Sequence, residues 1–423
     1  MLQINIIREN PKEIIDRLAI KNFKAEVLVE KIILLDSKRR EVQGKLDNNL
    51  AESNSIAKEI GVLFQSGKKE EANTLKARTA ELKTITKELS ESLQLTEKEL
   101  NDTLVLLPNL PHPSIPKGKG AEDNLVVLED GLIPQLAENA VPHWDLAIKY
   151  GIIDFETGVK ITGAGFPVYK GKGARLQRAL INFFLDNAIE NGYAETQPPF
   201  VVNEDSAYAT GQLPDKEGQM YHCGLDNLYL IPTAEVPVTN IYRDMIVRGD
   251  TLPLKNTAYS ACFRREAGSY GKDVRGLNRL HQFDKVEIVQ ITHPEKSYNT
   301  LEEMKDYVAG LLRKLELPFR IVKLCGGDMS FASAWTYDME VFSAAQQKWL
   351  EVSSVSNFET FQANRLKLRF RDGESKPQLA HTLNGSALAL PRIVAALLEN
   401  NQTAEGIRIP KALIPYTGFE LIN

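Results

Sequence analysis

Residues 263–289 read FRREAGSYGKDVRGLNRLHQFDKVEIV, a charge-dense segment between two stretches with the composition of β-strands. Because side chains alternate between the two faces of a strand, Phe283, Lys285 and Glu287 are predicted to share one face. Val286 and Ile288 then point the other way, into a core. A carboxylate at Glu287 needs a basic neighbour or a polar ligand. The pattern alone leaves two interpretations open, a ligand site and a salt-bridged surface hairpin.

The two ends of this strand differ in chemistry. Phe283 and Glu287 lie four residues apart, which is about 13 Å along a strand. An aromatic platform at one end and a carboxylate at the other would suit a ligand with a flat base and an amine or hydroxyl. On the preceding strand, alternation gives Arg264 and Glu266 the same face, whereas Arg265 takes the opposite one.

Bulk properties set the class of protein. The chain has 423 residues, of which 43% are hydrophobic, enough for a sizeable core and two domains. A net charge of -5 does not exclude a nucleic-acid partner, because a local basic patch is sufficient. Three dispersed cysteines without a C-x-x-C pair argue against a disulfide framework and a thiolate zinc site. With no apolar run of about 18 residues and a charged N-terminus, we expect a reduced, cytoplasmic protein with no membrane partner.

Residues 28–100 contain no proline and are rich in helix-forming residues. Apolar positions step by alternating three and four residues, which predicts an antiparallel α-helical coiled-coil hairpin with its turn in QSGKKEEA. Arg39, Asn49 and Ser53 interrupt the first seam, so we expect the hairpin to be looser in the middle. The seams consist of Leu28, Ile32, Leu35, Val42, Leu46, Ile56, Ile60 and Leu63, and of Leu75, Leu82, Leu89, Leu93 and Leu100.

The hairpin pattern by itself does not define a function. Basic clusters at Lys38, Arg39 and Arg40, with Lys45, could face a phosphate backbone. Acidic residues are equally numerous through residue 110, so a spacer or dimerisation arm with solvated faces is the competing interpretation.

The remaining chain predicts an α+β fold. Three parts are expected: a helical hairpin arm over 1–108, a Pro- and Gly-rich linker over 109–124, and a larger α+β domain over 125–423. Strand-like stretches separated by short loops favour an antiparallel β-sheet with flanking helices. The strand candidates are 228–238, 258–267, 281–291 and 349–358, and the helix candidates are 174–192 and 300–317. Neither a P-loop nor a dinucleotide-binding glycine pattern is present.

Three ordered motifs resemble those of the class II aminoacyl-tRNA synthetases. NGYAETQPPFVV is similar to motif 1 with Pro199, FRREAG followed by HQF to motif 2, and LNGSALALPR to motif 3 with Arg392. Within that class the chain resembles bacterial seryl-tRNA synthetases, through IPTAEVPVTN, EVSSVSNFETFQANR and the N-terminal hairpin. The resemblance implies an antiparallel sheet of six or seven strands and a homodimer built around motif 1.

The resemblance also implies site residues. The serine site would consist of Thr233, Ala234, Glu235, Glu287, Asn384 and Ser386. The ATP site would consist of Arg264, Arg265, Glu266, Arg279, Leu280, Phe283, Glu351, Val352, Ser353, Ser354 and Arg392. Arg264 would clamp the α-phosphate and Arg392 the γ-phosphate, while Phe283 stacks on adenine. Glu351 and Ser354 would hold Mg²⁺.

Further implied roles complete the ATP site. Arg279 would assist at the phosphates, Glu266 would lie near the adenine amino group, and the Leu280 backbone would lie against the base. By alternation Ser353, not Ser354, shares a face with Glu351, so the implied role of Ser354 requires a bulge or a turn. The charged loop between the two strands would form a flexible flap over ATP and the tRNA end.

The activity implied is ATP-dependent activation of L-serine and its transfer to serine tRNA, whose long variable arm the hairpin would grip. Serine charging of selenocysteine tRNA is a further expectation. Departures from the family pattern occur at Val355, Phe358 and Asn364, where local packing or contacts to the tRNA end would differ. Two rival classes remain: an enzyme that activates an amino acid for a carrier protein, and a non-enzymatic RNA-binding scaffold.

Overall fold

The computed structural model describes residues 1–215, 217–267 and 275–423. The chain divides into two compact units, one made of Met1–Ala19 and Phe23–Pro108, the other of Ile20–Asn22 and Asn109–Asn423. The predicted flap lies partly outside the described residues, so only its two ends, 264–267 and 275–281, can be placed.

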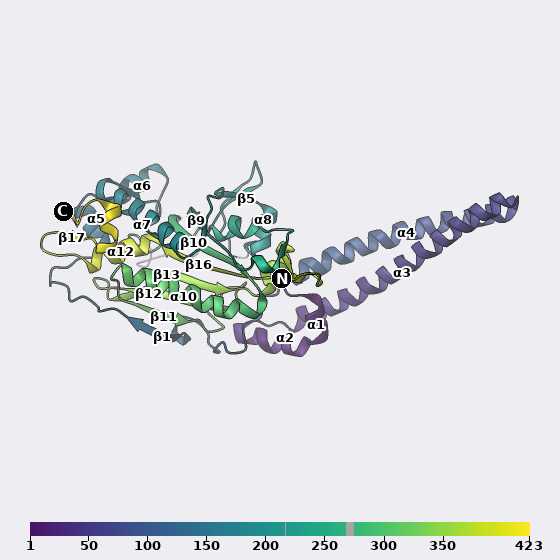
Figure 1. The fold of residues 1–423 in the computed structure, drawn as a ribbon, viewed down its shortest axis with the longest axis horizontal. Coiled ribbons are helices and arrows are strands. Elements are labelled where there is room, and N and C mark those ends of the chain that lie inside the picture. Colours follow the sequence, from purple (N-terminus) through teal and green to yellow (C-terminus); the bar gives the residue numbers. More distant parts are fainter. Residues whose placement is uncertain (216, 268–274) are drawn as a thin grey trace. The chain divides into compact units, whose positions relative to one another are not determined.

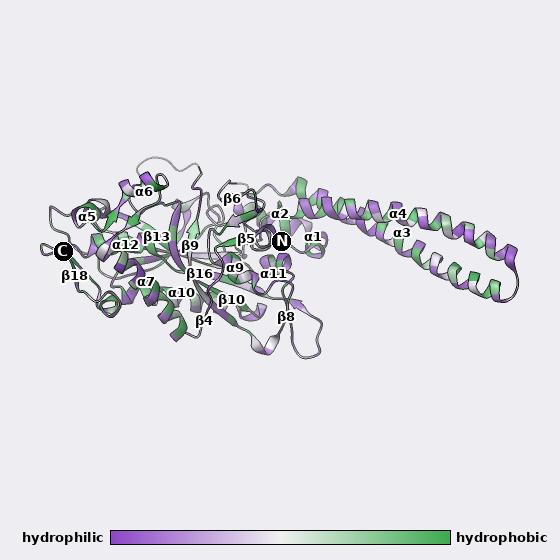
Figure 2. Ribbon diagram, turned by 90° about the horizontal axis from the view of Figure 1, so that it is seen from above, coloured by the Kyte–Doolittle hydropathy of each residue, from purple (hydrophilic) through white to green (hydrophobic). Residues whose placement is uncertain are grey.

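The first unit is a helical hairpin with two short helices at its base. Helices α1 (Ile4–Glu9) and α2 (Pro11–Leu18) precede α3 (Glu26–Gln65) and α4 (Lys69–Leu104), which run antiparallel side by side (Figure 1). Figure 2 shows hydrophobic and hydrophilic residues alternating along both long helices. The predicted coiled-coil hairpin is confirmed, and its buried seam includes Ile32, Leu35, Val42, Leu46 and Ile56 on α3 and Leu82 and Leu100 on α4.

Asn49 does not loosen the hairpin as the sequence suggested. Its side chain is buried, and its Nδ2 donates to the Leu82 carbonyl at 2.9 Å and to Thr86 Oγ1 at 2.7 Å. A buried amide with both donors satisfied fixes which turn of α4 faces which turn of α3. The polar interruption therefore sets the register of the two helices.

The second unit is built on an eight-stranded sheet with the order β1-β11-β12-β13-β16-β10-β9-β4. The strands are β1 (Leu125–Asp130), β11 (Phe319–Lys323), β12 (Trp335–Ser343), β13 (Lys348–Asn357), β16 (His381–Ala389), β10 (Gln282–Thr292), β9 (Leu254–Phe263) and β4 (Ala194–Glu195). Seven of them pair antiparallel, and the two-residue β4 adds to β9 in parallel. The antiparallel α+β prediction is confirmed, with eight strands where six or seven were expected.

Helices cover the two faces of this sheet unequally. Helices α7 (Gly171–Glu190), α10 (Ser297–Lys314) and α12 (Leu390–Asn400) bury the face that carries Val286 and Ile288 in one large apolar core (Figure 1). A smaller apolar cluster joins the opposite face to α8 (Glu204–Thr210), α9 (Glu235–Asn240) and α11 (Thr360–Leu366). The rest of that opposite face carries polar side chains and holds the candidate site.

Two local predictions were wrong. The strand expected over 228–238 is only β7 (Leu228–Leu230), after which the chain turns and enters α9. Pro232 cannot donate to a strand ladder, and Thr233 Oγ1 accepts the Glu235 N–H at 3.2 Å, which favours a helix start. The strand expected over 258–267 ends at Phe263, because Glu266 adopts a left-handed conformation with φ 50°.

The other predicted elements are present. Helices over 174–192 and 300–317 correspond to α7 and α10, and strands over 281–291 and 349–358 correspond to β10 and β13. Of the family departures, Val355 is fully buried and Phe358 nearly so, which places both in packing positions. All three cysteines are free thiols. Among the described residues, no helix is both long and apolar enough to cross a membrane.

Replacing Asn49 with Ala should destabilise the hairpin by about 1 kcal/mol, because two buried hydrogen bonds are lost. Asn48→Ala is the matched control, since Asn48 is an exposed neighbour on the same helix. Urea unfolding followed by far-ultraviolet circular dichroism reports on the helices. Tryptophan fluorescence reports on the second unit alone, because all three tryptophans lie there. Equal unfolding curves for the two variants would contradict the register role.

Candidate active site

The centre of the site is a buried ion pair on β10. Lys285 Nζ lies 2.5 Å from Glu287 Oε2 and donates to Thr233 Oγ1 at 2.9 Å. The Lys285 and Glu287 side chains are 6% and 1% exposed, so water screens this pair very little. The basic neighbour that Glu287 required is therefore the residue two positions before it on the same face of the strand.

A second buried carboxyl faces this pair. Glu235 is the first residue of α9, and its Oε1 accepts from Gln362 Nε2 at 2.6 Å. Burial and the nearby Glu287 raise the pKa of Glu235 to about 7. Burial also raises the pKa of Glu287, although Lys285 opposes that effect. With both carboxyls ionised, the cluster of Glu235, Glu287 and Lys285 is one positive charge short.

The other residues of the implied serine site lie on neighbouring elements. Ser386 on β16 pairs directly opposite Glu287 on β10, and Asn384 pairs opposite Val289. Two-residue spacing therefore puts Asn384 and Ser386 on the same sheet face as Glu287. Ala234 is fully buried at the start of α9 and supplies packing.

The other end of β10 carries an aromatic ring and an arginine. The Arg264 guanidinium lies 5.2 Å from the centroid of the Phe283 ring, and Arg264 Nε donates to the Pro232 carbonyl at 3.4 Å. Phe283 and Glu287 lie on one face of β10, as predicted. Arg265 is exposed, and its backbone N–H donates to the Gln219 carbonyl at 2.8 Å.

The two described ends of the segment between β9 and β10 contribute a carboxylate–arginine pair. Glu266 lies 3.3 Å from Arg279 Nε, and the pair is partly exposed. Strand alternation does not place Glu266, because the strand has already ended; its position comes from this ion pair. Leu280 is 5% exposed and packs in the main core, which fixes its backbone beside the start of β10.

A β-bulge on β13 explains how Glu351 and Ser354 of the EVSS segment come to lie on the same face of the strand. Glu340 on β12 pairs with Glu351, and the next residue back, Met339, pairs with Ser353, so Val352 is the extra residue. The bulge shifts the alternation by one, and Ser354 Oγ donates to Glu351 Oε1 at 3.4 Å. The bulge that the resemblance required is present. Ser353 turns inward and donates to the Ser386 carbonyl at 2.6 Å.

Arg392 closes the site from α12. Its Nε donates to the Asn278 carbonyl at 3.0 Å, its Nη1 donates to the Glu351 carbonyl at 2.5 Å, and the Glu351 carboxylate is 3.8 Å away. The two backbone acceptors orient the guanidinium without adding a negative charge, and the Glu351 carboxylate is too far away for a hydrogen bond, so the guanidinium can still bind an anion.

Sequence reasoning did not assign three residues that the structure brings into the site. Lys285 and Gln362 each contact a buried carboxylate, as described above. Asp338 on β12 pairs opposite Ser354, and its Oδ1 is buried without a hydrogen-bond partner among the described residues. Burial and then Glu351 raise the pKa of Asp338 well above its usual range. The alternation that marked Glu287 also marked Lys285, whereas Gln362 and Asp338 come from distant segments and carried no comparable signal.

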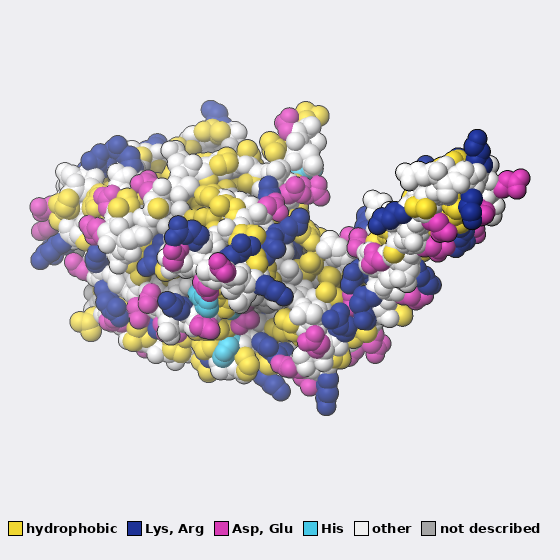
Figure 3. All heavy atoms as spheres, turned by 45° about the vertical axis from the view of Figure 1, so that its right-hand side comes forward, with side chains coloured by type: hydrophobic (Ala, Val, Ile, Leu, Met, Phe, Trp, Pro, Cys, Tyr) yellow, Lys and Arg dark blue, Asp and Glu magenta, His cyan; other side chains and the backbone are white. Residues whose placement is uncertain are grey.

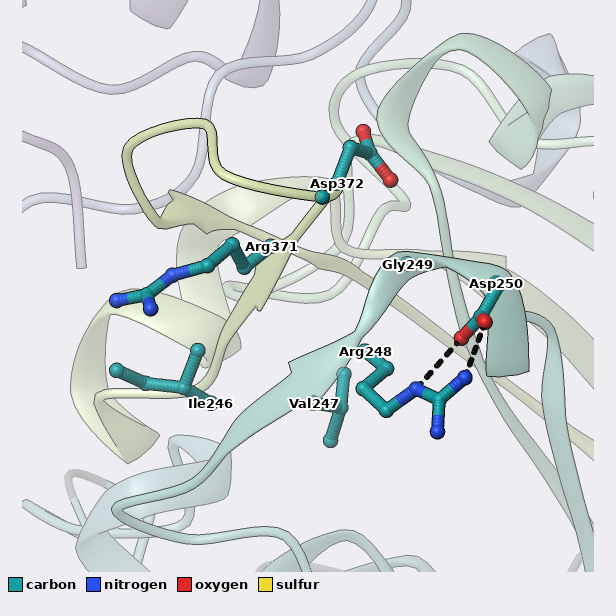
Figure 4. A pocket seen from close by; sticks show the side chains of 8 residues that line it. Ile246, Val247, Arg248, Gly249, Asp250, Arg371 and Asp372 are labelled. Atoms are coloured by element: carbon teal, nitrogen blue, oxygen red, sulfur yellow. Dashed lines mark hydrogen bonds and ion pairs between the residues drawn. The ribbon is translucent and has the colours of Figure 1, made fainter.

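A surface pocket elsewhere does not belong to this site. It is lined by Ile246, Val247, Arg248, Gly249, Asp250, Arg371, Asp372 and Gly373, between β8 (Ile246–Arg248) and β14 (Arg369–Arg371) (Figure 4). Its Arg248 is paired with Asp250. No residue of the candidate site lines this pocket.

Three of the four basic residues singled out in the hairpin, Arg39, Arg40 and Lys45, have acidic partners within their own helix. Arg39 and Arg40 both pair with Asp36, which is fully buried, and Lys45 pairs with Glu41. Although burial opposes it, Arg39 and Arg8 hold the pKa of Asp36 below its usual value. Lys38 is exposed. Figure 3 shows basic and acidic side chains interspersed over the hairpin.

The fold is that of a class II aminoacyl-tRNA synthetase. Residues 221–401 match the tRNA synthetase class II core domain (G, H, P, S and T), and residues 1–111 match the seryl-tRNA synthetase N-terminal domain. The chain is 50% identical over 425 residues to the serine–tRNA ligase of Salinibacter ruber, covering 100% of this chain and 99% of that protein. Identity to the serine–tRNA ligase of Chlorobium luteolum is 48%, with the same coverage.

The similarity extends to solved structures. The seryl-tRNA synthetase of Pyrococcus horikoshii complexed with ATP superposes with a TM-score of 0.92 at 35% identity, covering 100% of this chain and 99% of that chain. The chain belongs to the seryl-tRNA synthetase family, the ATP-dependent serine–tRNA ligases.

Replacing Lys285 with Met should lower the free energy of unfolding of the second unit by about 3 kcal/mol, because Glu287 loses its buried counter-ion. The double variant Lys285→Met, Glu287→Gln should recover much of this loss, since no unpaired buried charge remains at Glu287. Tryptophan fluorescence during urea unfolding at pH 8 measures both. A double variant no more stable than Lys285→Met would contradict the ion-pair interpretation.

Proposed function

We propose that this chain activates L-serine with ATP to form seryl-adenylate and then transfers serine to the 3′ end of serine tRNA. The observation that carries the proposal is the charge of the buried cluster, two carboxyls and one lysine. A substrate ammonium supplies the missing positive charge, and a substrate hydroxyl satisfies the remaining polar groups. Alanine would leave those groups unpaired, which penalises it by a factor of roughly 10⁴–10⁵.

In the first step the serine carboxylate attacks the α-phosphorus of ATP, and the bond to pyrophosphate breaks. No general base is required because the nucleophile is already an anion. Thr233, Glu235 and Glu287 position the amino acid, together with Asn384 and Ser386 on the neighbouring strand. Catalysis is then alignment of the two substrates and neutralisation of charge at the pentacoordinate phosphate.

The cations at the other end of β10 bind the nucleotide. Arg264 clamps the α-phosphate and Arg392 the γ-phosphate, where a planar guanidinium provides two parallel donors. Phe283 stacks on the adenine, with Arg392 covering its other face. Arg279, Glu266 and the Leu280 backbone surround the base and the phosphates; when adenine enters, Arg264 leaves its present place over the Phe283 ring.

Mg²⁺ fits the residues beside Arg392. Glu351 and Ser354 would hold it, and Asp338, which pairs opposite Ser354, has a buried Oδ1 without a hydrogen-bond partner among the described residues. When bound, Mg²⁺ would neutralise part of the negative charge of the ATP phosphates. Among the described residues no group of three or more His, Cys, Asp or Glu side chains could hold a metal.

In the second step a terminal ribose hydroxyl of the tRNA attacks the carbonyl carbon of the adenylate. The bond from that carbon to the phosphate oxygen breaks, AMP leaves, and its phosphate accepts the hydroxyl proton. Each part of the chain has its own role. Residues 1–108 bind the long variable arm of the tRNA, residues 109–124 connect the two domains, and residues 125–423 catalyse both steps. Within the arm, Lys38 is the best placed of the basic candidates, because Arg39, Arg40 and Lys45 are already paired with acids. Selenocysteine tRNA is a second acceptor where the organism has one.

The enzyme functions as a homodimer in the cytoplasm. Pro199 of motif 1 is exposed, and Val201 after it is 37% exposed, so this stretch is available to a second copy. Free thiols at all three cysteines are consistent with a reducing compartment.

Serine-dependent pyrophosphate exchange followed by charging of bulk tRNA tests the function. The expected result is exchange with serine alone among the amino acids, and serine attached to tRNA. Absence of serine-dependent exchange would refute the proposal, and exchange without charging would favour a carrier-protein acceptor.

The register of the hairpin allows a matched variant. Pairing of Lys31 with Glu99 and of Glu52 with Arg78 shows that residues 47 and 83 face each other, so 47–83 can be replaced by a short Gly–Ser turn. The shortened protein should retain exchange and lose most charging. Loss of exchange as well would contradict the division between domains.

The pKa of Glu235 predicts how serine use depends on pH. Because burial raises this pKa to about 7, the carboxyl is mostly protonated at pH 6 and cannot pair with the serine ammonium. The KM for serine in pyrophosphate exchange should therefore rise about tenfold from pH 8 to pH 6. Glu235→Gln should raise this KM at pH 8 and flatten its pH dependence, with the KM for ATP as the internal control. An equally steep profile in Glu235→Gln would rule out this carboxyl as the titrating group.

A further inference from the structure

A buried histidine lies outside the site but contacts the segment that builds its nucleotide end. His143 is the first residue of α5 (His143–Lys149) and is fully buried. Its Nε2 accepts the Leu277 backbone N–H at 2.8 Å. Its Nδ1 lies 2.6 Å from Glu399 Oε1 on α12, far closer than the 3.4 Å to Gln346 Nε2.

These two contacts define the state of the imidazole. A ring nitrogen that accepts an N–H carries no proton, so the proton is on Nδ1 and is donated to Glu399. Glu399 also accepts from the His143 N–H at 2.9 Å, from Gln346 Nε2 at 2.8 Å and from Ser343. Despite its burial, these bonds, those of His143 and Ser343 first, lower the pKa of Glu399, so it is a carboxylate.

The segment held by His143 packs too closely to move. Gly276 has φ 67°, and a Cβ there would lie 2.3 Å from His143 Nε2. Leu277 is 1% exposed in the main core, and the Arg275 guanidinium lies 4.7 Å from the ring centroid of Trp144. Residues 275–277 are thus held against α5, a few residues before Phe283.

The same network reaches an arginine of the ATP end. Asn278 Nδ2 donates to Gln346 Oε1 at 3.0 Å, and Gln346 in turn donates to Glu399. The Asn278 carbonyl accepts Arg392 Nε at 3.0 Å. Arg392 and Glu399 stand two turns apart on α12, so one helix carries both the arginine and the carboxylate that orients His143.

We propose that His143, oriented by Glu399, is a positioning residue for the ATP subsite: it holds residues 275–280 so that Arg279, the Leu280 backbone and Arg392 face the nucleotide. The inference rests on the proposed function only in taking these three groups as ATP contacts. His143 itself does not touch the substrate. Its loss should weaken ATP binding and leave the serine end of β10 intact.

Two substitutions separate the two ring nitrogens. In His143→Asn the side-chain amide can replace Nδ1 and still donate to Glu399, but nothing accepts the Leu277 N–H. In His143→Gln the longer amide can replace Nε2 and accept the Leu277 N–H. A purely structural role predicts that both variants lose function in proportion to their loss of stability.

The experiment measures the Kd of ATP by equilibrium dialysis without amino acid, at fixed Mg²⁺, and the KM for ATP and for serine in pyrophosphate exchange. In His143→Asn the Kd and KM for ATP should rise about tenfold, because the buried Leu277 N–H is left unsatisfied. The KM for serine should change less than about twofold, and His143→Gln should recover most of the ATP affinity.

An ATP Kd in His143→Asn equal to that of the unmodified enzyme would overturn the proposal. So would equal rises of the ATP and serine KM values in both variants. Gly276→Ala is a second route, because its Cβ would displace the same segment from His143, and it should give the same ATP-selective defect. Dialysis with ATP alone does not depend on the amino acid, so failure of serine activation would be seen separately, in the exchange assay of the unmodified enzyme.

Discussion

Strand β10 must place a charged face and an apolar face on the same eleven residues, and the second unit is organised around that constraint. Its backbone is satisfied by β9 on one side and β16 on the other, so the strand cannot turn to expose its charges. Val286 and Ile288 enter the core beneath α10 and α12, which forces Lys285 and Glu287 onto the opposite face. Burying those two charges is tolerable only because they pair with each other and with Thr233, and Thr233 also fixes the start of α9.

The two ends of the site are prepared in opposite ways. At the amino-acid end, carboxyls outnumber the lysine, and the buried cluster is completed by a cation from outside. At the nucleotide end, two backbone carbonyls orient the Arg392 guanidinium without adding a negative charge, whereas Arg264 lies over the Phe283 ring, which it leaves in the proposed mechanism when adenine binds. Charge that is already oriented before substrate arrives does not have to reorganise during the reaction. The hydrogen bonds that link His143, Glu399, Gln346 and Asn278 connect this oriented arginine to buried residues of the core.

The sequence predicted the hairpin, the antiparallel sheet and the polar face of β10, because each follows from a period of two or of three and a half residues. It did not predict where the strands stop. Pro232 and the left-handed Glu266 ended two strands early, and both effects depend on single backbone positions that leave the apolar pattern unchanged. Asp338, Gln362 and the His143–Glu399 pair were missed for another reason. Their partners lie far away in the chain, and only the folded sheet brings them together. Asn49 was misread because a polar residue in an apolar seam looks like a defect until its partners on α4 are known.

The bulge at Val352 shifts the alternation of side chains along β13 by one residue. Before it, odd-numbered positions such as Glu351 face the site, and after it even-numbered positions such as Ser354 do. A substitution in this strand alters one side chain, whereas an insertion or deletion of one residue between Leu350 and Val355 would exchange site and core along the rest of the strand. This segment therefore tolerates changes of residue type far better than changes of length. Engineered variants of residues 350–355 should therefore keep the number of residues in this segment unchanged.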